Sequence, residues 1–130
     1  MNAQLDQLKY DAKGLIPVIV QDVANGQVLM MAWMNREAIE KTLETKKVHT
    51  YSRSRGRLAL KGERSGHFQH VKELLTDCDR DVVLVKVDQV VAACHEGYRS
   101  CFYQQYDPSG GEWKTIAQKA FDPDVVYHKK

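Results

Sequence analysis

Residues 15–34 read LIPVIVQDVANGQVLMMAWM, and this stretch decides the fold. Residues 15–21 are almost continuously apolar and rich in β-branched side chains, a pattern typical of a buried strand. Asn25-Gly26 is a strong turn signal, and a second apolar run, residues 28–34, follows it. The sequence therefore predicts a β-hairpin with a slightly long loop.

The next segment carries the signals of a helix. Asn35 is a good N-cap, and residues 36–46 contain favourable helix formers. Three apolar residues fall on one face of this helix: Ala38, Ile39 and Leu43. We expect one main helix here.

Short extended segments fill much of the remaining chain. The expected strands cover residues 49–53, 71–76, 82–89 and 101–106, with turns at 54–57 and 77–81 and an exposed loop at 107–111. Several short strands and one clear helix indicate an α+β fold, a single domain with a largely antiparallel β-sheet. We divide it into an N-terminal leader (1–14), a core (15–106) and a C-terminal extension of the same domain (107–130).

Composition narrows the classes of protein that fit. The 130 residues are 43% hydrophobic, enough for one core, and the net charge of +2 is too small to imply a nucleic-acid or membrane partner. No segment approaches the roughly 18 to 20 apolar residues that cross a bilayer. The N-terminus also lacks the basic region and apolar run of a signal peptide, so we expect a cytoplasmic protein.

The three cysteines form the first group of residues able to carry chemistry: Cys78, Cys94 and Cys101. An odd number fits a disulfide framework poorly and fits metal ligands or free thiols better. Three thiolates would leave the fourth position of a zinc ion open for water, as catalysis requires, unless His95 completes the set. The spacing matches neither a zinc ribbon nor a deaminase, so ordinary buried thiols stay an alternative.

Three aspartates alternate with the first of these cysteines: Asp77, Asp79 and Asp81. Clustered carboxylates raise each other's pKa unless a cation neutralises them, and hard oxygen ligands suit Mg²⁺ or Ca²⁺. The alternative is an acidic, solvated turn. If residues 77–79 are extended, Cys78 points away from its two neighbouring aspartates, which favours two separate metal sites.

A basic segment lies between the helix and these acidic residues. Residues 51–67, YSRSRGRLALKGERSGH, contain four arginines, one lysine, three serines and three glycines. Arginine side chains and the backbone N–H groups of glycine-rich loops are suited to bind phosphate. A solvated basic hairpin and an RNA-binding surface are the alternatives.

Taken together, several segments closely resemble the phosphoribosyl-AMP cyclohydrolase family: LIPVIVQD, VLMMAWMN, YSRSRGRL, LKGERSGHFQHV, DCDRDVVLVKV and ACHEGYRSCFY. The resemblance runs from about Leu15 to Tyr103. It implies hydrolysis of the N1–C6 bond in the adenine ring of phosphoribosyl-AMP, a step of histidine biosynthesis.

The resemblance also implies the metals and the assembly. Zinc is assigned to Cys78, Cys94 and Cys101, and Mg²⁺ to Asp77, Asp79 and Asp81. The family forms an intertwined homodimer, in which one subunit supplies Cys78 and its partner supplies the other two zinc ligands. Neither nucleic acid nor membrane is an expected partner.

The expected mechanism follows from zinc chemistry. Zinc lowers the pKa of bound water towards 7, and the resulting hydroxide attacks C6 of the base. His95 is the candidate for the proton transfers, although it could instead orient a metal ligand. Four residues are the candidates for phosphate or ribose contacts: Arg53, Arg55, Lys61 and Ser65.

Two departures from the family pattern matter. Ala59 stands where the family usually has tryptophan, which removes a large contact surface near the substrate. Many relatives carry a fused pyrophosphohydrolase domain, but only about 25 residues follow the matching region here, below the roughly 50 of a domain. We therefore expect a single reaction.

Two rival functions give different predictions. A zinc-stabilised RNA-binding module would have a closed zinc site with four protein ligands and salt-dependent affinity for RNA. A zinc-dependent nucleotide deaminase would release ammonia, whereas ring opening retains every nitrogen.

Overall fold

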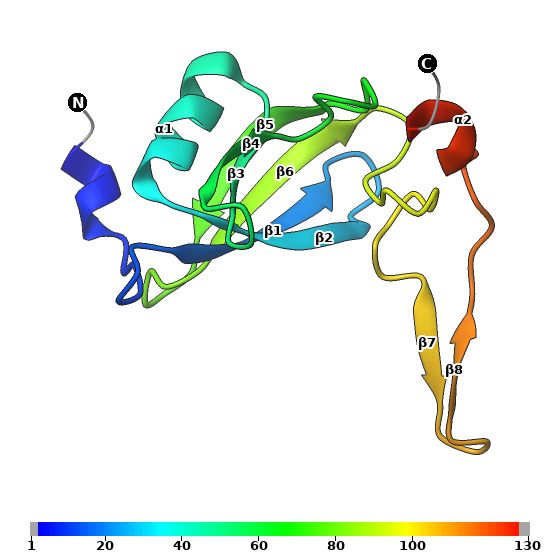
Figure 1. Cartoon of the computed structure of the whole chain (residues 1–130). Coiled ribbons are helices and arrows are strands. Elements are labelled where there is room, and N and C mark those ends of the chain that lie inside the picture. Colours follow the sequence, from blue (N-terminus) through cyan, green and yellow to red (C-terminus); the bar gives the residue numbers. More distant parts are fainter. Residues whose placement is uncertain (1–2, 128–130) are drawn as a thin grey trace.

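The computed structural model describes residues 3–127 (Figure 1). Its elements are η1 (Ala3–Gln7), β1 (Ile16–Asp22), β2 (Val28–Met34), α1 (Arg36–Thr45), β3 (His49–Ser52), β4 (Arg57–Leu60), β5 (Gln69–Thr76), β6 (Val83–Gln89), β7 (Gln104–Asp107), β8 (Glu112–Thr115) and α2 (Pro123–Tyr127). This is one small α+β domain with one main helix, as the sequence predicted.

A four-stranded sheet in the order β2-β1-β6-β5 forms the centre of the fold. β1 and β2 make the expected antiparallel hairpin, and β5 and β6 make a second one. The two hairpins join through β1 and β6, which run parallel, so the central sheet is mixed. Two further antiparallel hairpins, β3–β4 and β7–β8, lie outside it.

The main helix begins where its capping signal predicts. Asn35 Oδ1 accepts a hydrogen bond from the Ala38 N–H at 2.8 Å, which satisfies one of the unpaired amides of the first turn. The helix ends at Thr45, one residue before the predicted end. Lys46 adopts a left-handed conformation (φ 62°) and its N–H closes the last turn on the carbonyl of Thr42.

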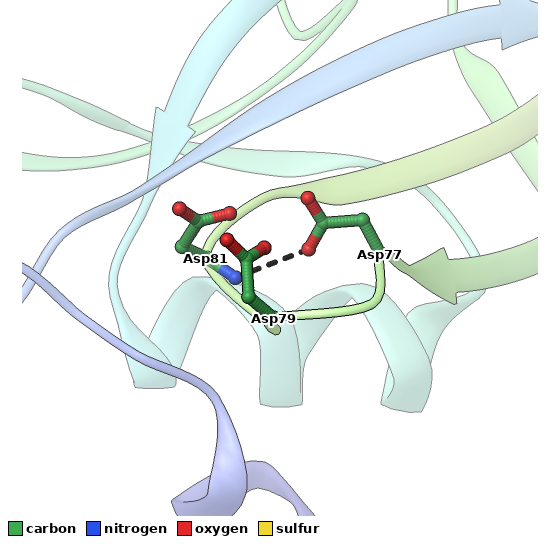
Figure 2. Close-up of side chains that lie close together, drawn as sticks. All are labelled: Asp77, Asp79 and Asp81. Carbon is green, nitrogen blue, oxygen red and sulfur yellow. Dashed lines mark hydrogen bonds between the residues drawn. The ribbon is translucent and has the colours of Figure 1, made fainter.

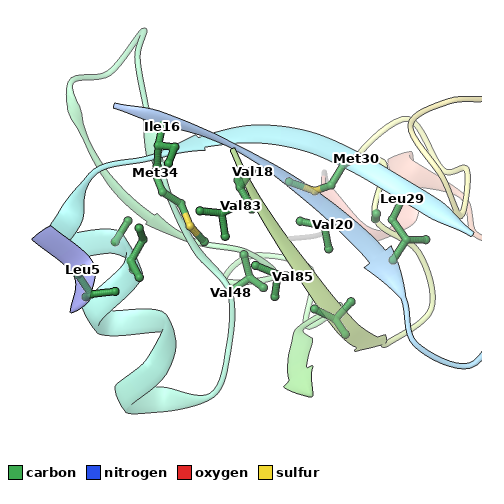
Figure 3. Close-up of a cluster of buried hydrophobic side chains, with 14 residues drawn as sticks. Leu5, Ile16, Val18, Val20, Leu29, Met30, Met34, Val48, Val83 and Val85 are labelled. Atoms are coloured by element: carbon green, nitrogen blue, oxygen red, sulfur yellow. The ribbon is translucent and has the colours of Figure 1, made fainter. Parts of the chain in front are cut away.

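One face of the sheet carries the hydrophobic core (Figure 3). Alternation along β1 buries Ile16, Val18 and Val20, and β6 adds Val83, Val85 and Val87 from the same side. The rest of the cluster comes from β2, α1, the 3₁₀ helix η1 and two loops: Leu29, Met30, Met34, Ala38, Ile39, Leu5, Val48 and Ala93.

The opposite face of the sheet carries a row of apolar side chains. The strand register places four of them side by side, one from each strand: Met31, Ile19, Leu84 and Leu75. Met31 and Leu75 are 43% and 39% exposed, and the other two are half-buried. We call these four residues the apolar row.

The N-terminal leader packs against the domain over its described residues, from residue 3 onward. Leu5 is buried in the core, and the Lys9 N–H donates to the carbonyl of Arg80 at 2.8 Å. The leader therefore contacts the turn between β5 and β6, which holds the three aspartates.

The strand expected at residues 101–106 begins later than predicted. Cys101 N–H donates to the carbonyl of Leu29, and Phe102 N–H donates to Ser100 Oγ. These bonds tie residues 101–102 to the end of the β1–β2 hairpin, so β7 starts at Gln104 and pairs with β8. The expected exposed loop 107–111 is the turn of this hairpin, which projects from the body of the domain (Figure 1).

Candidate active site

The three aspartates lie together on the turn between β5 and β6 (Figure 2). One carboxylate oxygen from each lies within 4.8 Å of the other two, and all three residues are exposed. The Asp81 N–H donates to Asp77 Oδ1 at 3.2 Å, which holds the turn closed. Among residues 3–127 this is the one group of three or more His, Cys, Asp or Glu side chains close enough to share a metal ion.

The aspartates were expected to raise each other's pKa, but the two that shift do so in opposite directions. Asp79 and Asp81 share a hydrogen bond between their side chains. This bond raises the pKa of Asp81 and lowers the pKa of Asp79. Hard carboxylate oxygens at this spacing fit Mg²⁺ in donor type. The segment is a turn rather than an extended strand, so the alternation argument for Cys78 does not apply to it.

Two of the three cysteines lie on one loop after β6. Within it, the Ala93 N–H donates to the carbonyl of Arg99 and the Cys94 N–H to that of Tyr98. Cys101 at its end is fixed to β2 through the carbonyl of Leu29. The backbone thus brings Cys94 and Cys101 together although six residues separate them in sequence.

An ion pair holds this loop against the β1–β2 hairpin. Asp22 is buried, and its carboxylate accepts hydrogen bonds from Arg99 and from the Ala24 N–H. The Arg99 guanidinium also donates to the carbonyl of Val91 at 3.0 Å, at the start of the loop. Burial alone would raise the pKa of Asp22, but these hydrogen bonds and the Arg99 charge lower it overall.

The surroundings of the two thiols suit a soft metal. Cys94 Sγ accepts a hydrogen bond from the Glu96 N–H at 3.4 Å, which fixes the position of this sulfur on the loop. Desolvation, and then the neighbouring Cys94, raise the pKa of Cys101 to about 11, whereas the Lys61 ammonium opposes this rise. A bound cation would reverse this shift and hold both sulfurs as thiolates.

Cys78 lies at the other end of the sheet. It follows β5 on the exposed acidic turn, whereas Cys94 follows the far end of β6. Seven residues of β6 separate these ends, a span of about 20 Å. One copy of the chain, over the described residues, therefore brings together two of the three predicted zinc ligands.

Two neighbouring cavities open beside Cys94. The larger has a volume of about 640 Å³, and its walls include Arg55, Arg64, His95, Glu96, Lys119 and Asp122. The smaller, of about 190 Å³, is lined by Thr50, Ala59, Lys61, Ser65 and His67 among others, and shares Arg55 and Arg64 with the larger. Ala59, the departure from the family pattern, thus lies in a cavity wall.

The predicted substrate contacts divide between these places. Arg55 lines both cavities and Ser65 the smaller one. Lys61 also lines the smaller cavity. Burial lowers the pKa of its ammonium group, and the charges of Cys101 and Cys94 oppose this shift. The ammonium group therefore lies near the two thiols. Arg53 lies elsewhere, with its guanidinium 4.6 Å from the ring centre of Trp33.

His95, the predicted catalytic residue, is exposed at the larger cavity. Its Nε2 lies 3.3 Å from Glu96 Oε2, and the side chain is 76% accessible. His95 directly follows Cys94 in the chain, and its side chain is exposed. A freely accessible imidazole beside a carboxylate is suited to exchange protons with a bound molecule.

Comparison with known proteins decides the family. The family model described as Phosphoribosyl-AMP cyclohydrolase matches residues 30–103, more than half of the chain. The chain belongs to this family. The matched residues include all three aspartates, all three cysteines and His95.

Curated cyclohydrolases of this name are similar over nearly the whole chain. A phosphoribosyl-AMP cyclohydrolase of Pelotomaculum thermopropionicum is 55% identical over 130 residues, covering 100% of both chains. One of Burkholderia cenocepacia is 52% identical over 128 residues, covering 96% of this chain and 93% of its own. One of Burkholderia mallei is 53% identical over 126 residues, covering 95% and 92%.

Membership in the cyclohydrolase family confirms the expected class of reaction. The chain is a hydrolase of the cyclic amidine bond of phosphoribosyl-AMP, in histidine biosynthesis. Within residues 3–127, no helix has the length and apolar character needed to span a membrane. The cytoplasmic location stays a prediction.

Two residues beside the cyclohydrolase site were not among the predicted site residues: His67, at the end of the basic segment, and Lys119. His67 is buried against Phe121, and its Nδ1 has no hydrogen-bond partner among the described residues. Burial, and then the Lys61 ammonium, lower the pKa of His67, which favours a neutral ring. Lys119 reaches the larger cavity from the C-terminal extension. The contact of His67 with Phe121, and the return of Lys119 to this cavity, both join segments that are distant in sequence.

Proposed function

We propose that this chain opens the adenine ring of phosphoribosyl-AMP with zinc and magnesium, in a site shared between two copies. The observation that carries the proposal is the pair of thiols, Cys94 and Cys101, beside two cavities with cationic walls. Water adds its oxygen to C6, the N1–C6 bond breaks, and N1 takes a proton. The products retain every nitrogen.

Zinc fits the donor set better than a hard cation would. Cys94 and Cys101 supply soft thiolate ligands, and the Glu96 N–H is already directed at the first sulfur. Cys78 of the partner subunit would be the third ligand, leaving one position open. When bound, zinc supplies Lewis-acid activation of water near neutral pH.

A second copy of the chain is the proposed occupant of the apolar row. Cys78 cannot reach the other two thiols within one copy, so a three-cysteine site requires another. The row Met31, Ile19, Leu84 and Leu75 is an uncovered apolar surface of the kind that marks protein interfaces. The projecting β7–β8 hairpin adds exposed Tyr106 and Trp113, which suit an intertwined dimer.

Magnesium is proposed at Asp77, Asp79 and Asp81. The pKa of Asp81 is raised first by its hydrogen bond with Asp79 and then, among smaller causes, by the charges of Asp79 and Asp77; a divalent cation would offset that repulsion. The same turn carries Cys78. In the shared site, this cation would therefore lie near the zinc that Cys94 and Cys101 of the other copy bind. There it would help to bind phosphate and to position the base.

The chain's own side chains would bind the nucleotide and move protons. His95 would deliver the proton that N1 takes, and the Glu96 carboxylate 3.3 Å from its Nε2 would balance the charge of the protonated ring. Lys61 would balance the negative charge of the two thiolates rather than bind phosphate. Arg55 and Ser65, on the cavity walls, are the candidates for phosphate or ribose contacts; Arg53, stacked on Trp33, is a weaker one.

The direct test is turnover of phosphoribosyl-AMP, followed by absorbance, before and after removal of zinc with a chelator. Activity that disappears with zinc and returns when zinc is added back supports the proposal. An ammonia assay on the same samples should be negative, because ring opening releases no nitrogen. Ammonia release would favour a deaminase, and folded, zinc-loaded protein without turnover would contradict the proposed reaction.

The shared site has its own test. Cys78→Ser and Cys94→Ser proteins should each be inactive, because each lacks one zinc ligand in both sites. After joint unfolding and reassembly, mixed dimers would contain one intact site, so a random mixture should recover about one quarter of wild-type activity. Each variant refolded alone is the control. Well-folded mixtures with no recovery would exclude ligands from two subunits.

A further inference from the structure

The C-terminal extension returns to the candidate active site. After β8, residues 116–127 run back along the loop that follows β6 and end in α2 (Figure 1). We call residues 116–127 the C-terminal strap. The N–H groups of Ala120 and Phe121 donate to the carbonyl of Gly97 at 2.7 and 3.3 Å. The strap is therefore bound three residues from Cys94.

This contact requires glycine at position 97. Gly97 has φ 105°, a conformation that L side chains rarely adopt, and an added Cβ would lie 2.7 Å from the carbonyl oxygen of Phe121. Any side chain would push the strap away. The backbone of the loop and that of the strap are thus in direct contact.

The strap also contacts the basic segment. The Phe121 ring packs edge-on against the buried ring of His67, with 4.7 Å between ring centres. Arg64 donates to the carbonyl of Tyr127 at 3.4 Å, and its guanidinium lies 5.7 Å from the centre of that ring. Anchored at Gly97, at His67 and at Arg64, the strap forms one wall of the larger cavity.

The lining of this cavity is mixed in charge. Cations enter from two separate segments: Arg55 and Arg64 from the basic segment and Lys119 from the strap. Arg64 is occupied by Tyr127, but neither the Arg55 guanidinium nor the Lys119 ammonium has a hydrogen-bond or ion-pair partner among the described residues. Glu96 and Asp122 add carboxylates to the same walls.

Such a lining matches a phosphorylated sugar. Unpaired guanidinium and ammonium groups bind phosphate, and carboxylates accept hydrogen bonds from ribose hydroxyls. A volume of about 640 Å³ is within the range of small-molecule sites. His95 at the edge of the cavity directly follows Cys94, so a nucleotide held here would extend its base towards the thiols.

We propose that the larger cavity binds one phosphoribosyl end of the substrate, with Arg55 and Lys119 contacting its phosphate and the C-terminal strap holding Lys119 in place. This inference rests on the proposed function and makes the strap part of the substrate site.

Ribose 5-phosphate is the probe, because it contains the proposed ligand group and needs no catalysis. Calorimetric titration of the zinc-loaded protein at low salt should show saturable binding. Lys119→Ala and Arg55→Ala should each weaken it about tenfold, the loss of one charge-assisted hydrogen bond. Lys72→Ala is the matched control, since Lys72 is exposed on β5 outside the cavity, and it should bind as wild type does.

The strap's role is tested by a double-variant cycle. Phe121→Ala removes the contact with His67, so it should weaken binding and reduce the further effect of Lys119→Ala to less than threefold. Fully additive effects would show that Lys119 does not depend on the strap. Wild-type protein without ribose 5-phosphate binding, or equal weakening by Lys72→Ala, would overturn the proposed subsite.

These experiments can distinguish a failure of the proposed subsite from a failure of the proposed function. If turnover of phosphoribosyl-AMP is absent but binding of ribose 5-phosphate depends on Lys119, the reaction is wrong and the subsite stands. If zinc-dependent turnover is present and the KM of Lys119→Ala is unchanged, the reaction stands and the subsite is wrong.

Discussion

Replacing Arg99 by methionine tests how the cysteine loop is held. The substitution keeps most of the aliphatic side chain but removes the guanidinium that bonds Asp22 and the carbonyl of Val91. Asp22 would then be a buried carboxylate without its cationic partner, held only by backbone N–H groups such as that of Ala24. Because Arg99 lies between Cys94 and Cys101, the loop that carries both thiols should lose stability.

The expected magnitude follows from burial. An exposed ion pair contributes less than about 1 kcal/mol, whereas removing one partner of a buried pair costs about 3–5 kcal/mol. The Asp22 side chain is 3% accessible and that of Arg99 is 36%. Because one partner is buried and the other is partly exposed, the cost of removing Arg99 should lie between the values for exposed and buried ion pairs. We expect Arg99→Met to lower the free energy of unfolding by roughly 2 kcal/mol, or Tm by about 6–10 °C.

The dependence on pH gives a sharper assay than the magnitude alone. The pKa of Asp22 is lowered in the folded chain, so its ion pair stabilises the fold above the ordinary carboxyl pKa of about 3.9. This contribution is lost as the pH falls through the lower, folded value. In urea unfolding at fixed protein concentration, the gap between wild type and Arg99→Met should therefore be widest at pH 6–7 and narrow below pH 4.

Lys41→Met is the matched control. Lys41 pairs with Glu44 at 3.6 Å on the surface of α1, and its loss should change stability by less than about 0.5 kcal/mol at either pH. A gap for Arg99→Met that is no larger than the control's, or that stays constant down to pH 3, would refute the role assigned to the Asp22 pair.

Three further substitutions test other parts of the structure. Ile39→Ala, in the core, should lower the free energy of urea unfolding by about 2–5 kcal/mol, whereas Leu43→Ala on the exposed side of α1 should cost less than half as much. Gly62→Ala should cost at least about 2 kcal/mol, because Gly62 has φ 92° and a Cβ would lie 2.7 Å from the carbonyl carbon of His67; near-wild-type stability would contradict this geometry. Asp79→Asn should weaken Mg²⁺ binding in calorimetry at least tenfold without moving the metal-free urea midpoint, and unchanged affinity would exclude the aspartate site.

The parts of the fold that the sequence predicted are those with local signals. The β1–β2 hairpin follows from two apolar runs around Asn25-Gly26, and α1 starts at the cap Asn35. The parallel pairing of β1 with β6 joins residues more than 60 positions apart, and no local pattern specifies it. The start of β7 was misplaced because bonds to Leu29, distant in sequence, hold Cys101 out of the strand.

The same division applies to the candidate site. Asp77, Asp79 and Asp81 could be predicted as a cluster because one short turn holds all three. Lys61 could be recognised as a functional candidate, but only the fold shows that it lies beside the two thiols rather than on an exposed loop. Lys119 was missed because it belongs to an exposed, aperiodic segment whose path back to the site depends on Gly97.

Adjacent residues of β1 point to opposite faces of the sheet, so one strand contributes both to the hydrophobic core and to the outer surface. Val18 and Val20 belong to the core, whereas Ile19 between them belongs to the apolar row. Substitutions at the outward positions can therefore change the surface with little effect on the interior, because successive side chains of a strand point to opposite faces of the sheet. In the proposed dimer, Ile19 and Leu84 are therefore the positions at which polar substitution should separate the two copies while each chain stays folded, a starting point for building partners of altered pairing preference.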